Sequence, residues 1–226
     1  MPIPHPWDLT PTEARKLQNE LAHLIDTSTP LTKWDVIAAA DVSMGKYDKD
    51  LAAAVVVVRG DTFEVIERAG VVRPITYPYV PGLLSFREIP ALLEVFEKRI
   101  KTPFDVVLCD GQGVAHPRRM GIASHLGLWL DRPTVGCAKS RLFGEFVEPG
   151  PRRGDRSELS DRGERIGEVV RTKDRVAPLF VSPGHRCDFE SSVELVLATS
   201  GKYRLPGPAR MAHEFVNEVR RGGRDV

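Results

Sequence analysis

The chain has 226 residues, of which 42% are hydrophobic and 28% charged, with a formal net charge of +1. This is the composition of an ordinary globular protein, and it excludes a strongly basic nucleic-acid-binding chain while leaving room for a local basic patch. No apolar run approaches the roughly 20 residues that span a bilayer, and no basic-then-apolar leader is present, so a cytoplasmic protein without membrane contact is expected. Cys109, Cys137 and Cys187 are odd in number and scattered, which indicates buried thiols rather than disulfides or a zinc site.

The first half of the chain predicts a helix, three strands and a second helix. Thr10, Pro11 and Glu13 form the capping-box start of an amphipathic helix. Apolar runs then predict strands over residues 34–44, 51–60 and 62–72. A loop rich in proline, tyrosine and glycine covers residues 74–85, and a helix is predicted from about Pro90 to Arg99.

Strands and helices alternate in the second half. Strands are predicted over residues 104–110, 133–140 and 177–186, and helices over residues 120–131, 191–200 and 208–221. The charged, glycine-bearing segment 149–175 is predicted to be a surface excursion. Three strands followed by strand–helix alternation predict an α/β protein with one mixed sheet flanked by helices, in a single domain over residues 1–226.

Two aspartates stand at the ends of apolar runs. Asp41 ends the run VIAAAD, and Asp110 ends the run VVLCD. If the two carboxylates project into a shared crevice, they could hold a divalent cation such as Mg²⁺, which prefers hard oxygen ligands. Taken singly, either aspartate is better explained as turn chemistry, which is common at a strand end.

Glu88, in the segment LLSFREIPALL, has two interpretations. It could be the third position of a capping box that begins at Ser85. Pro90 argues against this box, because a proline loses a hydrogen bond inside a helix but none at the first helical position. A helix that starts at Pro90 leaves Glu88 in the preceding loop, where it could be a third metal-facing carboxylate.

The loop DGQGVAHP lacks the spacing and the lysine of phosphate-loop and dinucleotide fingerprints. Gly111 and Gly113 permit either close approach of a ligand to bare backbone or simply a tight turn. His116 could contact a phosphate or cap a turn. Lys139 could neutralise phosphate charge or be solvated, and His213 lies on a predicted helix where it could be structural.

The segment YPYVPGLL is apolar and stiffened by prolines. It could pack on the core as an ordinary loop. Alternatively, it could form a rigid wedge that separates stacked bases.

Six motifs occur together and in order: DVSM, YPYVPGLLSFRE, DGQGVAHPRRMGIASHLG, GCAKS, SPGHR and RLPGPARMAHE. Over roughly residues 10–220 they resemble the endonuclease V family of deoxyinosine-specific repair nucleases. The PYVPG and DGQG…H segments are highly specific as a pair. The resemblance implies a ribonuclease H-like fold, which agrees with a mixed sheet flanked by helices.

The resemblance also implies roles for individual residues. The ligands of a catalytic Mg²⁺ or Mn²⁺ would be Asp41, Asp110 and Glu88. The residues that assist at the scissile phosphate or support that region would be His213, Lys139 and His116. The wedge would consist of Tyr79, Val80 and Pro81. The pocket for the lesion base would be lined by Gly82, Leu84, Gly111, Gly113, Ile122 and Gly136.

The implied activity is metal-assisted hydrolysis of DNA at the second phosphodiester bond 3′ to deoxyinosine, in duplex or single strands, leaving 3′-hydroxyl and 5′-phosphate ends. Backbone N–H groups would donate to O6 of a flipped-out hypoxanthine and refuse the amine of adenine, and the tight pocket would leave no room for N2 of guanine. Two alternatives stay open: an endoribonuclease for inosine-containing RNA and a non-catalytic protein that marks deaminated bases. A monomer is expected.

Arginines alternate with acidic residues over residues 149–175. The favoured interpretation is a solvated surface whose charges pair with one another. The alternative is that Arg152 and Arg153, together with Arg118 and Arg119, follow the DNA backbone beside the pocket, since phosphate contacts position a protein without reading bases.

Overall fold

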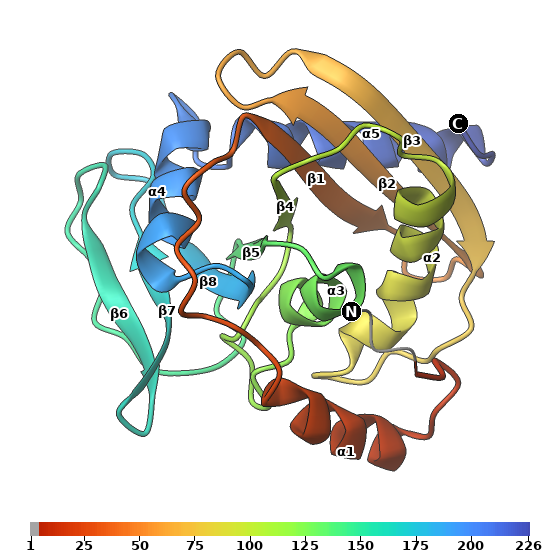
Figure 1. Ribbon diagram of the computed structural model, residues 1–226, viewed down its shortest axis with the longest axis horizontal. Helices are drawn as coiled ribbons and strands as arrows, with labels where there is room; N and C mark the ends of the chain where they lie inside the picture. Colours follow the sequence, from red (N-terminus) through yellow and green to blue (C-terminus); the bar gives the residue numbers. More distant parts are fainter. Residues whose placement is uncertain (1–4) are drawn as a thin grey trace.

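Eight strands form one mixed sheet with helices on both faces (Figure 1). The computed structural model describes residues 5–226. The strands are β1 (Val36–Ser43), β2 (Asp50–Arg59), β3 (Val65–Pro74), β4 (Val106–Cys109), β5 (Thr134–Ala138), β6 (Arg156–Asp161), β7 (Glu164–Val170) and β8 (Leu179–His185). The helices are α1 (Pro11–Ala22), α2 (Leu84–Lys98), α3 (Ile122–Leu130), α4 (Phe189–Ser200) and α5 (Gly207–Gly222).

The strands lie in the order β3-β2-β1-β4-β5-β8-β7-β6. β4 pairs in parallel with β1 and with β5, whereas the other neighbouring strands are antiparallel. Hairpin-linked strands thus lead into a parallel centre whose connections pass through α2 and α3. The predicted α/β class, with one mixed sheet flanked by helices, is confirmed.

The two faces of the sheet carry different helices. α4 and α5 contribute to the core on one face, and α2 and α3 to the core on the other (Figure 1). Successive strand residues point to opposite faces, so Ile37 and Ala39 of β1 belong to the α4–α5 side, and Ala38 and Ala40 to the α2–α3 side. By the same alternation, Asp41 is directed to the α4–α5 side.

The N-terminal helix and the cysteines are as the sequence predicts. Thr10 Oγ1 accepts a hydrogen bond from the Glu13 N–H at 3.3 Å, and the Glu13 carboxylate accepts one from the Thr10 N–H at 2.9 Å, which completes the capping box of α1. The three cysteines are free and buried. Within residues 5–226, none of the helices has both the length and the apolar character needed to cross a membrane.

The predicted start of α2 at Pro90 is wrong. The helix begins at Leu84, with Pro90 in its interior and without a side-chain cap. Pro90 has no N–H to donate to the preceding turn, a loss of about 3 kcal/mol or more in a helix interior. The first two turns nevertheless bury Phe86 and Ile89 completely, and this packing offsets the lost hydrogen bond. Glu88 therefore lies on a helix rather than in the preceding loop.

The segment 149–175, predicted to be a surface excursion, contains two strands of the sheet, β6 and β7. β7 pairs with β8 and extends the sheet, and its residues 166–170 are buried. Arg162 and Gly163 connect the two strands with φ values of 53° and 83°. Two left-handed residues are the signature of a tight hairpin turn, and the surrounding charges obscured it in the sequence.

Candidate active site

The parallel pairing of β1 with β4 brings the two strand-end aspartates together. Ala40 of β1 is in register with Cys109 of β4, so Asp41 and Asp110 occupy the next position on neighbouring strands. Both follow residues whose alternation directs them to the α4–α5 side of the sheet. The sheet therefore presents two carboxylates side by side.

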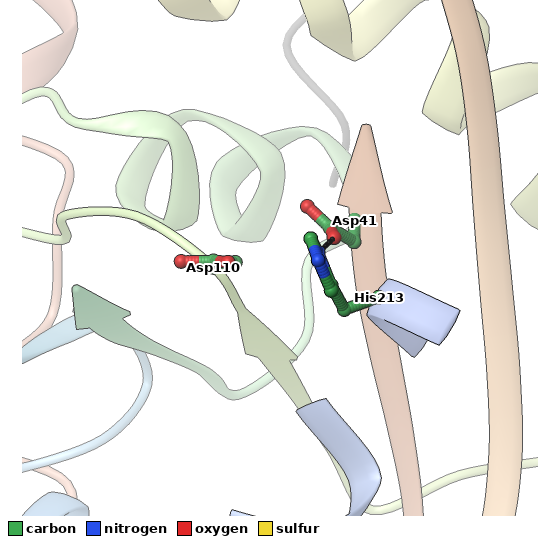
Figure 2. A group of neighbouring side chains, drawn as sticks. All are labelled: Asp41, Asp110 and His213. Carbon is green, nitrogen blue, oxygen red and sulfur yellow. Dashed lines mark hydrogen bonds and ion pairs between the residues drawn. The ribbon is translucent and has the colours of Figure 1, made fainter. Parts of the chain in front are cut away.

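His213 of α5 completes a three-residue cluster with these aspartates (Figure 2). One ligand atom from each of Asp41, Asp110 and His213 lies within 4.8 Å of the others. His213 Nδ1 is 2.8 Å from Asp41 Oδ2, and its Nε2 is 3.3 Å from the side-chain amide nitrogen of Asn217. Since that amide can only donate, Nε2 accepts, and Nδ1 carries the hydrogen that Asp41 accepts.

The electrostatics of the cluster favour a cation. Burial raises the pKa of Asp41, and the neighbouring charge of Asp110 raises it further. Lys139, at the end of β5, already places its ammonium group on the Asp110 carboxylate. Two neighbouring, partly buried carboxylates are costly to ionise unless a cation lies between them. Together with the histidine nitrogen, they form a donor set that fits a hard divalent ion.

Glu88 approaches the same charges from α2. Burial and then the charge of Asp41 raise its pKa to about 8, with a smaller contribution from Asp110. Within residues 5–226, Glu88 does not belong to the cluster of Asp41, Asp110 and His213, whose ligand atoms lie within 4.8 Å of one another. The structure thus brings Glu88 into electrostatic contact with the pair, as a partly buried carboxylate that a bound cation would help to ionise.

A cavity of about 370 Å³ opens beside the carboxylates. Asp110 and Lys139 form one part of its wall. The proposed wedge and pocket residues that line it are Tyr79, Val80, Pro81, Gly82, Leu84, Gly111 and Ile122. Its size lies within the usual range for small-molecule sites, so it can take a single nucleobase.

Gly113 and Gly136, expected to line this pocket, are not among the described residues that form its wall. A Cβ atom on Gly113 would lie 2.0 Å from the Pro183 carbonyl oxygen, and one on Gly136 would lie 2.4 Å from the Gly113 nitrogen. Both glycines therefore let β5 and β8 pack directly against the 110–113 loop. Gly111 is also required for close packing, because its Cβ would lie 2.6 Å from Ile122 Cγ2.

His116 was expected near the scissile phosphate, but it is only 2% exposed and bonded internally. Its Nδ1 accepts the Arg118 N–H at 3.1 Å, which leaves Nε2 to donate to the Gly82 carbonyl oxygen, also at 3.1 Å. Burial lowers the pKa of His116 to about 4, so the ring is neutral at physiological pH. The structure thus gives His116 a hydrogen bond to the wedge loop.

The arginines considered for backbone contact mostly have internal partners. Arg119 donates to Asp161 at 2.8 Å and also pairs with Glu164. Arg118 donates to the Gly82 carbonyl oxygen at 2.8 Å, and Arg153 donates to the Leu197 carbonyl oxygen at 2.6 Å. Arg119 thus pairs with acidic residues, whereas the guanidinium groups of Arg118 and Arg153 are held by carbonyl oxygens.

The sequence interpretation missed two glutamines near the cavity. Gln112 lines it, and Gln18 of α1 bonds to the wedge loop from behind. Gln18 follows Ala14 by four residues and is fully buried with it. A polar residue on the apolar stripe of a predicted helix was the available signal, because a buried amide requires partners.

The sheet topology and the carboxylate cluster define a nuclease with a ribonuclease H-like fold. A profile of the family described as endonuclease V matches residues 19–214. An endonuclease V from Trichormus variabilis is 46% identical over 216 residues, covering 95% of this chain and 97% of that protein. The chain belongs to the endonuclease V family, as its motifs predict.

Solved structures of this family confirm the fold. An endonuclease V from Streptomyces avermitilis has a TM-score of 0.92 at 36% identity, covering 98% of this chain and 97% of that one. An endonuclease V from Ciona intestinalis was solved with a 23mer DNA that contains an inosine followed by a ribo-adenosine. That structure has a TM-score of 0.82 at 25% identity and covers 95% of this chain and 99% of that one.

Proposed function

We propose that this endonuclease recognises deoxyinosine in DNA and hydrolyses the second phosphodiester bond 3′ to it, leaving 3′-hydroxyl and 5′-phosphate ends. The observation that carries the proposal is the shared wall between the base-sized cavity and the carboxylate cluster, formed by Asp110 and Lys139. A base in the cavity would keep its own strand within reach of the cluster. The inosine-containing DNA bound by the Ciona relative supports the same substrate.

The cavity would read the lesion through backbone groups. Gly82, Leu84, Gly111 and Ile122 line it with little polar side-chain chemistry. Backbone N–H groups in this wall can donate a hydrogen bond to O6 of hypoxanthine, whereas the amine of adenine is itself a donor and would find no acceptor there. The base must leave the stack to enter, and a deaminated base pairs poorly, which lowers the cost of flipping it.

Asp41, Asp110 and Glu88 would hold Mg²⁺, and Mn²⁺ would also be accepted, since both ions bind carboxylate oxygens. When bound, such a cation lowers the pKa of a water and stabilises charge on the leaving oxygen. Burial, and after it the charge of the neighbouring carboxylates, raises the pKa of Asp41 and Glu88, and this is the structural feature that fits the ion.

The remaining side chains would manage charge and protons at the scissile phosphate. Lys139 can pass from Asp110 to a phosphate oxygen, because its ammonium group is partly exposed at the cavity wall. His213 Nε2 is held as an acceptor by the hydrogen bond from Nδ1 to Asp41, so it can take a proton from a water that displaces the Asn217 amide.

The test is an inosine-containing duplex incubated with the protein and Mg²⁺, with the cut position read to single-nucleotide resolution. A cut one nucleotide further 3′ than the bond next to the lesion, abolished by EDTA, is the expected result. Cutting of undamaged DNA at the same rate would contradict the proposal. Binding to inosine DNA without any cutting would instead point to a protein that only marks deaminated bases.

An endoribonuclease for inosine-containing RNA is a second candidate. The ribonucleotide that follows inosine in the Ciona complex favours it, because the sugar beside the lesion is then that of RNA. The same cavity and carboxylates would serve both activities, so selectivity would rest on contacts with the 2′-hydroxyl. Matched DNA and RNA oligonucleotides with one inosine decide between them by their relative kcat/KM.

Three broader expectations accompany this function. The continuous sheet supports one domain over residues 1–226. We infer a cytoplasmic location, which suits both the DNA substrate and three free thiols. We also infer a monomer, for the reason argued from the sheet edges in the Discussion.

A further inference from the structure

The carbonyl oxygen of Gly82, next to the wedge residues 79–81, accepts an unusual number of hydrogen bonds. Gln18 Nε2 lies 3.1 Å from it, His116 Nε2 lies 3.1 Å from it, and Arg118 Nη2 lies 2.8 Å from it. A carbonyl oxygen has two lone pairs, so three donors saturate it. We propose that Gln18 and Arg118, with His116, form a clamp on Gly82 that positions the wedge for displacing the lesion base.

The donors also bind one another, which makes the clamp rigid. Arg118 Nε donates to Gln18 Oε1 at 2.6 Å, and the Arg118 N–H donates to His116 Nδ1 at 3.1 Å. The Gln18 amide nitrogen is additionally 3.2 Å from the Met120 carbonyl oxygen. Each side chain therefore has one orientation and one pattern of hydrogens, so the loop cannot shift without breaking several bonds together.

The clamp is dry on the side away from the cavity. Gln18 is 0% exposed and His116 is 2% exposed, so their bonds to Gly82 do not compete with water. The bond from the Arg118 guanidinium is charge-assisted and is the shortest of the three. The pKa of Arg118 is lowered by burial, an arrangement suited to holding a loop rather than meeting solvent-exposed phosphates.

Gly82 itself is shaped for this arrangement. Its φ of +77° is in the left-handed region, and a Cβ atom there would lie 2.7 Å from Arg118 Nη2 and 3.4 Å from His116 Nε2. Any side chain at this position would therefore push the donors away. Glycine serves here both the backbone conformation and the approach of the clamp.

The position of the clamp links it to base displacement. Tyr79 is 68% exposed at the tip of the loop, whereas Val80 packs against the buried cluster that includes Ala14 of α1 and Leu83. Unstacking a base step costs a few kcal/mol, so a wedge that does this must keep its conformation against the DNA. A flexible loop would change its own conformation instead. α1 supplies this resistance through apolar packing and through Gln18.

This inference rests on the proposed function, and its test separates the two. Gln18→Leu removes the amide at nearly constant size, and Asn19→Ala on the exposed face of α1 is the matched control. The measurements are kcat/KM on inosine duplex and inosine single strand, with thermal melting of each variant. Wild-type protein that fails to cut either substrate would refute the proposed function and leave the clamp without a role.

The expected result for Gln18→Leu is a loss of about tenfold or more on the duplex and a much smaller loss on the single strand, where little stacking opposes the wedge. Asn19→Ala should keep the wild-type ratio. Equal losses on both substrates, or an unchanged ratio, would overturn the clamp assignment. If Gln18→Leu does not fold, Arg118→Lys is examined in the same way, since it keeps a donor but loses the bond to Gln18.

Two further measurements distinguish positioning from other roles. The first uses duplex DNA with 2-aminopurine next to inosine, and Ca²⁺ in place of Mg²⁺. The 2-aminopurine fluorescence should rise less on saturation with Arg118→Lys than on saturation with wild-type protein, because fewer bases are unstacked. For Arg118→Met, which removes the charge, the slope of log affinity for ordinary duplex against log salt should equal that of the wild type. A slope flattened by about 0.9 would make Arg118 a phosphate contact and overturn the assignment.

Discussion

Asp110 is the residue at which the proposed functions meet, because it lines the cavity, neighbours Asp41 and pairs with Lys139. Asp110→Asn should keep the fold and the binding of inosine DNA but abolish cutting. The amide has nearly the same shape, yet it lacks the charge that holds a cation. Single-turnover cutting in Mg²⁺ and binding in EDTA check this, with Asp61→Asn in the β2–β3 turn as control. Cutting near the wild-type rate would contradict the metal assignment.

Glu88 makes a pH-dependent prediction without metal. Its folded-state pKa of about 8 lies above the ordinary value, so the native protein holds a proton that the unfolded chain releases near pH 4.5. That linkage stabilises the native state at low pH, and the contribution is lost as the pH rises through about 8. Glu88→Gln, which stays neutral, should therefore melt higher than wild type at pH 8.5 in EDTA, with little difference at pH 5.

Added Mg²⁺ provides the control for Glu88. The cation should raise the melting temperature of wild-type protein at pH 8.5 and reverse its order with Glu88→Gln, because only the carboxylate gains a favourable partner. A melting difference that is the same at both pH values would show that the pKa of Glu88 is not raised. A melting difference that does not respond to Mg²⁺ would show that Glu88 is not a ligand of the cation.

At the scale of elements, the loop before α2 presents Tyr79 to solvent while its neighbour Val80 is anchored. Tyr79→Ala should slow cutting of inosine in duplex DNA by about tenfold and in single strands by clearly less, since a wedge matters where bases are stacked. Competition between the two substrates in one reaction measures the ratio directly. Val147→Ala, an exposed apolar residue outside the cavity wall, is the control. Equal losses would indicate general DNA contact.

The elements differ in how far the sequence could predict them. The central strands and α1 follow from apolar runs and a capping box, which are local signals. The start of α2 does not, because the cost of Pro90 is local whereas the burial of Phe86 and Ile89 that offsets it depends on the rest of the fold. β7 was missed because Glu168 interrupts its apolar pattern and makes the segment resemble a surface loop. In the structure Glu168 is buried on the strand, where it pairs with Arg165.

The candidate site shows the same division. The two aspartates were predictable as strand ends, but their adjacency depends on the register of β1 with β4, which no local pattern encodes. The glycines of the DGQG motif permitted either close approach of a ligand or a tight turn, and the resemblance to the family implied that Gly113 and Gly136 line the pocket. For Gly113 and Gly136 the close neighbour is another strand, and a sequence pattern cannot distinguish the two causes. The internal bonds of His116 likewise required the position of Gly82.

At the scale of the whole molecule, both edges of the sheet are protected, which supports a monomer. β3 is covered by the C-terminal residues, where Gly70 and Val226 exchange two backbone hydrogen bonds of 2.9 and 3.0 Å. β6, at the other edge, carries charged residues such as Arg156 and Glu158. Covered and charged edges both oppose strand pairing between molecules. Sedimentation equilibrium should therefore give a mass close to 25.1 kDa.

Asp225 attaches the C-terminal residues to β3 by hydrogen bonds. Its carboxylate accepts the Val72 N–H at 3.0 Å, two hydrogen bonds from Arg73 at 2.9 Å and one from Arg99 at 2.7 Å. Asp225→Ala removes this partly exposed network and should lower the free energy of unfolding by about 1–2 kcal/mol. It should also promote self-association, because the edge of β3 is freed. Arg224→Ala, at an exposed neighbouring position, should do neither.

The pH dependence of this loss identifies its origin. Hydrogen bonds from Arg73, with the charges of Arg73 and Arg99, lower the pKa of Asp225 below its ordinary value of about 3.9. A depressed carboxylate pKa contributes stability above the unfolded-state value, and the contribution disappears as the pH falls through the folded-state value. Urea unfolding should therefore show the full difference between wild type and Asp225→Ala at pH 7 and a progressively smaller one as the pH falls below the ordinary value of about 3.9. A difference independent of pH would mean that the residue acts through packing and backbone geometry rather than through its charge.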